Sequence, residues 1–271
     1  MTTPRITSRQ NPRVKDAVRL RTARERQRSG RFLIDGVREI ERALAAGIRP
    51  IEAFVCETHD ELHCATAIAG LRSAGSELLP VTAEVFEKLC FGERDEAGIV
   101  VVAETPSRRL ADISLPAGPL VAVVEGVEKP GNLGAILRSA DAAGVDAVIV
   151  ADGRTDLFNP NAIRASLGTV FQPNVVEAST AETIEWLQSQ QLTIVVARPD
   201  AEMLYTEVDL RGPSAVVLGS EADGLSAAWN GEIATPIRLP MHGLADSLNV
   251  STTAAVLFYE ALRQGSASRN T

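Results

Sequence analysis

Three loops after residue 125 of this 271-residue chain combine glycine with side chains that form hydrogen bonds. They are residues 126–144, which open a helix (the first loop), 216–225 (the second loop) and 237–251 (the third loop). Glycine lets a ligand lie against bare backbone, while amide, hydroxyl, carboxylate and guanidinium groups can orient it. The candidate polar residues are Asn132, Arg138, Glu221, Ser247 and Asn249. Such groups suit a nucleoside ligand such as adenosine.

Each of these residues also has a structural interpretation. Asn132 could be the N-cap of the following helix, and Ser247 and Asn249 could cap the apolar helix after them. Arg138 could be an ordinary surface arginine, but it lies four residues after Gly134 and so shares a helix face with the loop. We therefore favour a functional role for Arg138 and leave the other interpretations open.

Apolar residues accompany the polar ones in the second and third loops. Leu218 ends a predicted buried strand, Gly219 follows it, and Leu239, Met241 and Leu248 lie in the third loop. Ligands of open α/β sheets bind beyond the carboxyl ends of the strands. We expect these five residues to line a cofactor pocket, although a purely structural turn remains an alternative for the second loop.

Other chemical signatures are missing from the sequence. There is no Walker A pattern, no G-x-G-x-x-G at a strand-to-helix turn and no G-x-S-x-G elbow. Cys56, His59, His63 and Cys64 fall within nine residues, but their spacing is irregular for zinc. We interpret these four as surface or half-buried residues and predict no metal site.

The pattern around the three loops predicts an α/β domain with a parallel sheet. Its strands are near-continuous Val, Ile and Leu runs, typical of a sheet covered on both faces. The predicted strands are 120–124, 147–151, 192–197 and 215–218, and the predicted helices are about 134–143, 181–190 and 250–263.

A second, smaller α/β domain is predicted at the N-terminus. Its helical segments are 12–29, 37–45, 61–74 and 83–89, and its strands are 32–34, 51–56, 77–81 and 98–103. Residues 105–118 read as a linker because prolines and adjacent arginines interrupt the apolar pattern. The predicted domains are therefore 1–104 and 119–271.

Charge is distributed unevenly along the chain. The net charge is −8, yet the first 31 residues hold ten basic and only two acidic side chains. A basic segment on an acidic body is expected where one face meets phosphates, although a solvated amphipathic helix would also be basic. The candidate nucleic-acid contacts in this segment are Arg9, Arg13, Arg19 and Arg24.

The bulk properties predict a cytoplasmic protein that does not bind a membrane. No apolar run approaches the length of a membrane span, and the first residues lack the apolar core of a signal peptide. The three cysteines form no disulfide framework, which fits a reducing compartment.

The three loops, taken in order, resemble the three motifs of the SpoU (TrmH-type) branch of the SPOUT methyltransferases. The resemblance covers about residues 120–263, and residues 8–12, 32–36 and 98–100 resemble that family's N-terminal substrate-binding domain. It implies a C-terminal SPOUT domain with a trefoil knot, a homodimer, the cofactor S-adenosylmethionine and an RNA substrate. One departure is Lys129, which replaces a common acidic residue and could contact phosphate.

The resemblance also implies residue roles. Arg138 matches the catalytic arginine, and Asn132, Glu221, Ser247 and Asn249 match the polar residues around it. Gly219, Leu239 and Leu248 match positions that hold the adenosyl group. The predicted activity is methylation of a ribose 2′-hydroxyl in structured RNA, with ribosomal RNA favoured over transfer RNA. The alternatives are a tRNA 2′-O-methyltransferase, a base methyltransferase and a non-catalytic RNA-binding dimer.

Overall fold

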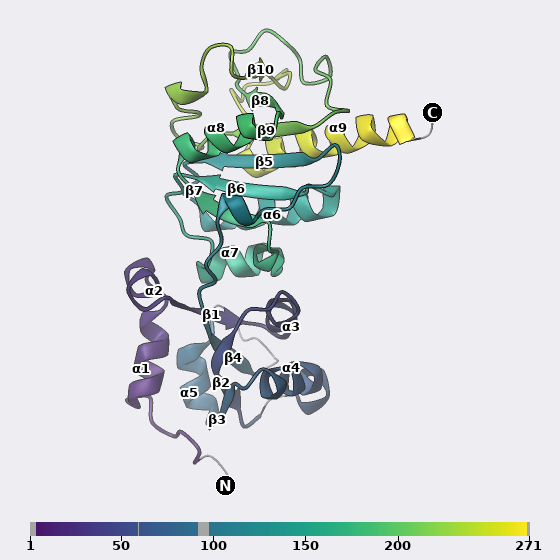
Figure 1. Ribbon diagram of the computed structural model, residues 1–271. Coiled ribbons are helices and arrows are strands. Elements are labelled where there is room, and N and C mark those ends of the chain that lie inside the picture. The colour runs from purple at the N-terminus through teal and green to yellow at the C-terminus, as the bar shows by residue number, and fades with distance from the viewer. Residues whose placement is uncertain (1–3, 59, 92–97, 270–271) are drawn as a thin grey trace. The chain divides into compact units, whose positions relative to one another are not determined.

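A computed structural model describes residues 4–58, 60–91 and 98–269 and divides the chain into two compact units (Figure 1). Unit 1 comprises Met1–Ser107 and Asp156–Phe171, and unit 2 comprises Arg108–Thr155 and Gln172–Thr271. The segment 156–171, which lies inside the C-terminal domain predicted from the sequence, thus packs within the N-terminal unit.

Unit 1 is built on a four-stranded mixed sheet with the order β1-β4-β2-β3. β1 and β2 run antiparallel to β4, and β3 is parallel to β2. Its core joins apolar residues of the sheet to Val14 of α1 and Leu89 of α5. The elements are α1 (Pro12–Arg19), α2 (Ala23–Ser29), β1 (Arg31–Asp35), α3 (Val37–Ala45), β2 (Pro50–Cys56), α4 (Glu61–Ser73), β3 (Glu77–Val81), α5 (Ala83–Leu89), β4 (Ile99–Glu104), α7 (Pro160–Ala165) and the short 3₁₀ turn η2 (Thr169–Phe171).

Aromatic packing and a buried ion pair explain why segment 156–171 belongs to unit 1. The rings of Phe158 and Phe171 lie 4.5 and 6.0 Å from that of Phe32 on β1, measured between centroids. Asp156 accepts two hydrogen bonds, of 3.0 and 2.5 Å, from the guanidinium of Arg26, which is only 4% exposed. Breaking such a buried pair by removing one partner is strongly destabilising.

Unit 2 is built on a six-stranded sheet with the order β10-β8-β9-β5-β6-β7, and all of its pairings are parallel. This confirms the predicted parallel sheet; the knot stays a prediction. The elements are η1 (Leu110–Asp112), β5 (Leu120–Glu125), α6 (Pro130–Ala143), β6 (Ala147–Ala151), β7 (Val175–Ala178), α8 (Thr180–Ser189), β8 (Thr193–Ala197), β9 (Ser214–Leu218), η3 (Ala227–Trp229), β10 (Thr235–Ile237) and α9 (Val250–Arg269).

The strand order places a topological switch point between β5 and β9. From β5 the chain continues to β6 and β7 on one side, and β8, β9 and β10 lie on the other. Val124 of β5 pairs with Leu218 of β9, so the first and second loops leave the sheet side by side. Ligands of open α/β sheets bind at this kind of position.

Several predicted boundaries are wrong for identifiable reasons. The segment 12–29 forms two helices with a break at 20–22. β7, β10 and α7 were not predicted because they are short. α6 begins at Pro130 rather than near residue 134, because proline has no N–H to lose in a first turn. α9 continues past residue 263 to Arg269.

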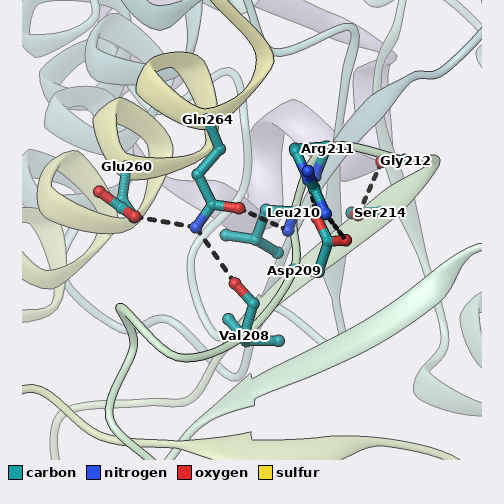
Figure 2. A network of polar contacts seen from close by, with 8 residues as sticks. All are labelled: Val208, Asp209, Leu210, Arg211, Gly212, Ser214, Glu260 and Gln264. Carbon is teal, nitrogen blue, oxygen red and sulfur yellow. Dashed lines mark hydrogen bonds and ion pairs between the residues drawn. The ribbon is translucent and has the colours of Figure 1, made fainter. Parts of the chain in front are cut away.

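Gln264 ties α9 to the segment that leads into β9 (Figure 2). Its Nε2 donates to the carbonyl of Val208 at 3.1 Å and to Glu260 at 2.8 Å, while its Oε1 accepts from the Leu210 N–H at 2.8 Å. Glu260, which is 8% exposed, also accepts two hydrogen bonds from Arg263. α9 packs in addition on α6, so the helix that follows the third loop is held on several sides.

Within the described ranges, no helix is both long and apolar enough to pass through a lipid bilayer.

Candidate functional site

The three loops meet at one cavity of about 520 Å³ in unit 2. Its volume lies in the range of small-molecule sites. Its wall includes residues from the ends of β8, β9 and β10, from the start of α9, and Lys129 just before α6. The predicted site residues that line it are Lys129, Leu218, Gly219, Glu221, Leu239, Met241, Ser247, Leu248 and Asn249. We call it the sheet-edge cavity.

Asn132 links the three loops to one another. Its Nδ2 donates to the carboxylate of Glu221, and its Oδ1 accepts from Nδ2 of Asn249 at 3.3 Å. Because α6 begins at Pro130, Asn132 lies inside the first helical turn, and the prediction that it is the N-cap is wrong. Its side chain is therefore available to bridge the loops rather than to cap the helix.

Asn249 caps the helix after the third loop and also contacts the first loop. Its Oδ1 accepts from the N–H of Ser251 at 2.9 Å and from the hydroxyl of Ser251 at 2.6 Å, which caps the start of α9. Its amide nitrogen faces Asn132 at the same time. Ser247 and Leu248 lie in the exposed part of the third loop, where Leu248 is 40% exposed.

The second loop folds back on itself at Gly219. The backbones of Ser220 and Gly224 exchange two hydrogen bonds of 3.1 Å. A Cβ atom at position 219 would lie 2.2 Å from the carbonyl carbon of Gly224, far inside van der Waals contact. Only glycine at position 219 allows this turn, so the loop's shape depends on that residue.

Arg138 lies on α6 and does not line the sheet-edge cavity. Its side chain is exposed and has no hydrogen bond or ion pair with any residue that the structure describes. The predicted catalytic arginine is therefore an unpaired cation at the surface of a single chain. A guanidinium in this state can bind a phosphate or a carboxylate.

Sequence reasoning missed Arg154, which connects the first two loops. Its guanidinium pairs with Glu128 and lies 2.7 Å from Asp223, and these hydrogen bonds, Asp223 first, raise its pKa. The Arg154 N–H donates to the carbonyl of Val127 at 3.1 Å. Its position three residues after β6, at the carboxyl edge of a parallel sheet, was the signal that could have identified it.

The predicted RNA contacts of unit 1 differ in how they are paired. Arg9 and Arg13 form ion pairs with acidic residues elsewhere in unit 1, and Arg19 pairs with Asp16. Arg24 is exposed and forms no hydrogen bond or ion pair within the described part of the chain.

No cluster of three metal-ligating side chains occurs among the residues that the structure describes. Cys56 and Cys64 are both buried, so the prediction that they lie at the surface or half-buried is wrong. The thiol of Cys56 lies 3.2 Å from the hydroxyl of Thr58. His59 lies outside the described residues.

Two family models match the chain. The SpoU rRNA methylase family matches residues 119–259, and the MRM3-like substrate binding domain matches residues 11–99. A 23S rRNA (uridine(2479)-2′-O)-methyltransferase of Streptomyces viridochromogenes is 32% identical over 89% of this chain and 85% of its own length.

Solved structures of similar proteins agree with this family match. A crystal structure of an RNA 2′-O ribose methyltransferase superposes with a TM-score of 0.82 at 47% identity, over 96% of this chain and 99% of that one. An AdoMet-bound rRNA methyltransferase from Sinorhizobium meliloti superposes with a TM-score of 0.87 at 27% identity, over 96% and 98% of the two chains. The predicted resemblance is confirmed: this chain belongs to the SpoU rRNA methylase family.

Proposed function

We propose that this protein transfers the methyl group of S-adenosylmethionine to the 2′-hydroxyl of a ribose in 23S-type ribosomal RNA. The observation that carries the proposal is the meeting of three loops at the sheet-edge cavity, where Asn132 bonds to both Glu221 and Asn249. The relative from Streptomyces viridochromogenes carries a 23S rRNA 2′-O-methyltransferase name, and this chain spans most of its length.

The sheet-edge cavity fits S-adenosylmethionine in its chemistry. Leu218 is buried and Leu239 is half-buried, and both line the cavity together with Gly219. We assign these three residues, with Met241 and Leu248, to the binding of the cofactor. When bound, S-adenosylmethionine supplies a methyl group that its sulfonium charge makes electrophilic.

The polar residues would act on the ribose and its phosphate. Arginine carries a permanent positive charge, so Arg138 would hold the phosphate beside the target ribose and stabilise the developing negative charge on the 2′-oxygen. Asn132, Glu221, Ser247 and Asn249 would orient the hydroxyl toward the methyl group.

The proposed assembly is a cytoplasmic homodimer. Arg138 is not among the residues that line the sheet-edge cavity. On α9, the side chains of Tyr259 and Leu262 are 51% and 41% exposed. We propose that a second copy of the chain covers this apolar surface.

The proposed RNA contacts extend over both units. Arg24 and Lys129 have no ion-pair partner within the described residues and can take phosphates directly. Arg9, Arg13 and Arg19 would exchange acidic partners for phosphates. Such contacts release counterions and make the affinity salt-dependent.

The test is a methyl-transfer assay with the purified full chain and cofactor carrying a labelled methyl group. We expect label in 23S rRNA and, after digestion to nucleosides, in a 2′-O-methylated ribose. Label on a base would refute ribose specificity, and label only in tRNA would refute the substrate. Cofactor binding without any transfer to RNA would support a non-catalytic RNA-binding dimer.

A further inference from the structure

A buried carboxylate supports the second loop from behind. We propose that Glu125, the last residue of β5, is a positioning residue that holds the second loop in the shape that binds the cofactor. The inference rests on the proposed function and adds a residue to it. Glu125 does not line the sheet-edge cavity and would act through Ser226, which directly follows the loop.

Three hydrogen bonds converge on the Glu125 carboxylate, which is only 6% exposed. Oε2 accepts from the backbone N–H of Ser226 at 2.7 Å, and Oε1 accepts from the Ser226 hydroxyl at 2.8 Å. Oε1 also accepts from the hydroxyl of Thr180 at the start of α8, at 2.8 Å. Hydrogen bonds to an ionised acceptor are about twice as strong as neutral ones.

The second loop needs such a support because a hollow lies on its other side. A cavity of about 720 Å³ is lined by Glu125, Thr180 and Ser226. Ser220 and Gly224 line both this cavity and the sheet-edge cavity, so the loop forms a wall between the two. The hydrogen bonds of Glu125 therefore add to the packing of Leu225 against the core of the parallel sheet.

Both ends of the loop are fixed to the same strand. Leu218 pairs with Val124 in the sheet, and Ser226 is bound by the next residue of β5, Glu125. This fixes the distance that the loop spans before any ligand arrives. A preorganised loop binds more tightly because less conformational freedom is lost on binding.

Calorimetric titration with S-adenosylmethionine tests the inference. In Glu125→Ala we expect the second loop to adopt other conformations as well. The Kd should then rise about tenfold or more, because only the molecules with the loop in the binding conformation bind the cofactor. Glu125→Gln should remain within about threefold of wild type, because its oxygen can accept from Ser226 N–H while the hydroxyls rotate to accept from its amide. Hydrogen exchange at residues 219–226 should rise in the alanine variant alone.

Matched variants separate positioning from general stability. Thr180→Val removes a bond to the same carboxylate without touching the loop and should leave the Kd unchanged, whereas Ser226→Ala should weaken binding. If Glu125→Ala does not fold, the Kd values of Ser226→Ala and Glu125→Gln still test the positioning role. Lower thermal stability with unchanged Kd would overturn the inference, as would equal losses in Thr180→Val and Ser226→Ala. A large loss in Glu125→Gln with normal exchange would mean that the charge itself acts on the cofactor.

The wild-type titration distinguishes the two proposals. Absence of cofactor binding by the wild-type protein would refute the proposed function. Binding by wild type that Glu125→Ala and Ser226→Ala leave unchanged would refute the positioning role alone.

Discussion

Unlike most arginines of this protein, Arg138 has no hydrogen bond or ion pair to its side chain among the residues that the structure describes. Arg154, Arg198 and Arg211, for comparison, each bind an acidic or amide side chain within unit 2. An exposed guanidinium that forms no ion pair contributes little to the free energy of unfolding. Its placement on α6, the helix that also carries Asn132, is consistent with a role in the reaction.

Arg138→Ala should therefore abolish methyl transfer and leave cofactor binding intact. We expect a loss of at least about 100-fold in kcat, the scale seen when one group that stabilises a developing oxyanion is removed. The Kd for S-adenosylmethionine should stay within about twofold. Arg211→Ala, which removes an exposed arginine paired with Asp209, is the control. Near-normal turnover by Arg138→Ala would refute the role.

Gly219→Ala should weaken cofactor binding. The added Cβ would lie 2.2 Å from Gly224, so the second loop must open and the wall of the sheet-edge cavity must move. Gly212→Ala is the matched control, since a Cβ at that position meets nothing within 4 Å. We expect at least about a tenfold rise in Kd, measured by calorimetry, for Gly219→Ala only. Equal affinities of the two variants would contradict the prediction.

At the scale of elements, α9 depends on the polar network around Gln264. Gln264→Ala removes one acceptor and two donor interactions and leaves the Leu210 N–H without its partner. We expect unit 2 to lose about 1–3 kcal/mol of unfolding free energy in urea denaturation. The control is Gln188→Ala at an exposed position of α8, where we expect a change below about 0.5 kcal/mol. Equal losses in both variants would mean that the network contributes nothing specific.

Glu260 gives α9 a stability that depends on pH. Hydrogen bonds from Arg263, and then from Gln264, lower the pKa of the Glu260 carboxyl below its ordinary value. Because the folded-state pKa is the lower one, this stabilisation is complete above the ordinary pKa and is lost as the pH falls through the folded-state value. The difference in unfolding free energy between wild type and Glu260→Gln should shrink from pH 7 toward acid. A difference independent of pH would contradict this.

The parallel sheet and the three loops could be predicted because their signals are local. Runs such as residues 147–151 are buried on both faces and carry their pattern in adjacent residues. The role of Glu125 could not be predicted, because Ser226 lies 101 residues away and nothing near Glu125 in sequence indicates it. Likewise, the contact of Phe158 and Phe171 with Phe32 could not be predicted, because the sequence around each phenylalanine does not indicate its partner.

At the scale of the whole molecule, the charge of the first 31 residues is partly neutralised within unit 1. Since Arg24 has no ion-pair partner among the described residues, Arg24→Ala should weaken RNA binding and lower the slope of log affinity against log salt by about 0.7–0.9. Filter binding of a 23S rRNA fragment at several salt concentrations measures both. Arg109→Ala, whose guanidinium binds Asp112, should change neither quantity. An unchanged slope in Arg24→Ala would exclude a phosphate contact there.

Residues 156–171 belong to unit 1 although they are encoded between β6 and β7 of unit 2. Dividing the chain near residue 107, by a protease or in the gene, would therefore not give two fragments that fold independently. One fragment would keep Arg26 buried without Asp156, and the other would carry Phe158 and Phe171 without Phe32. A chain nicked at this point should elute as one species, while each half expressed alone should aggregate. For the same reason, one recombination event could not exchange the N-terminal unit for that of another enzyme, and two coordinated crossovers would be required.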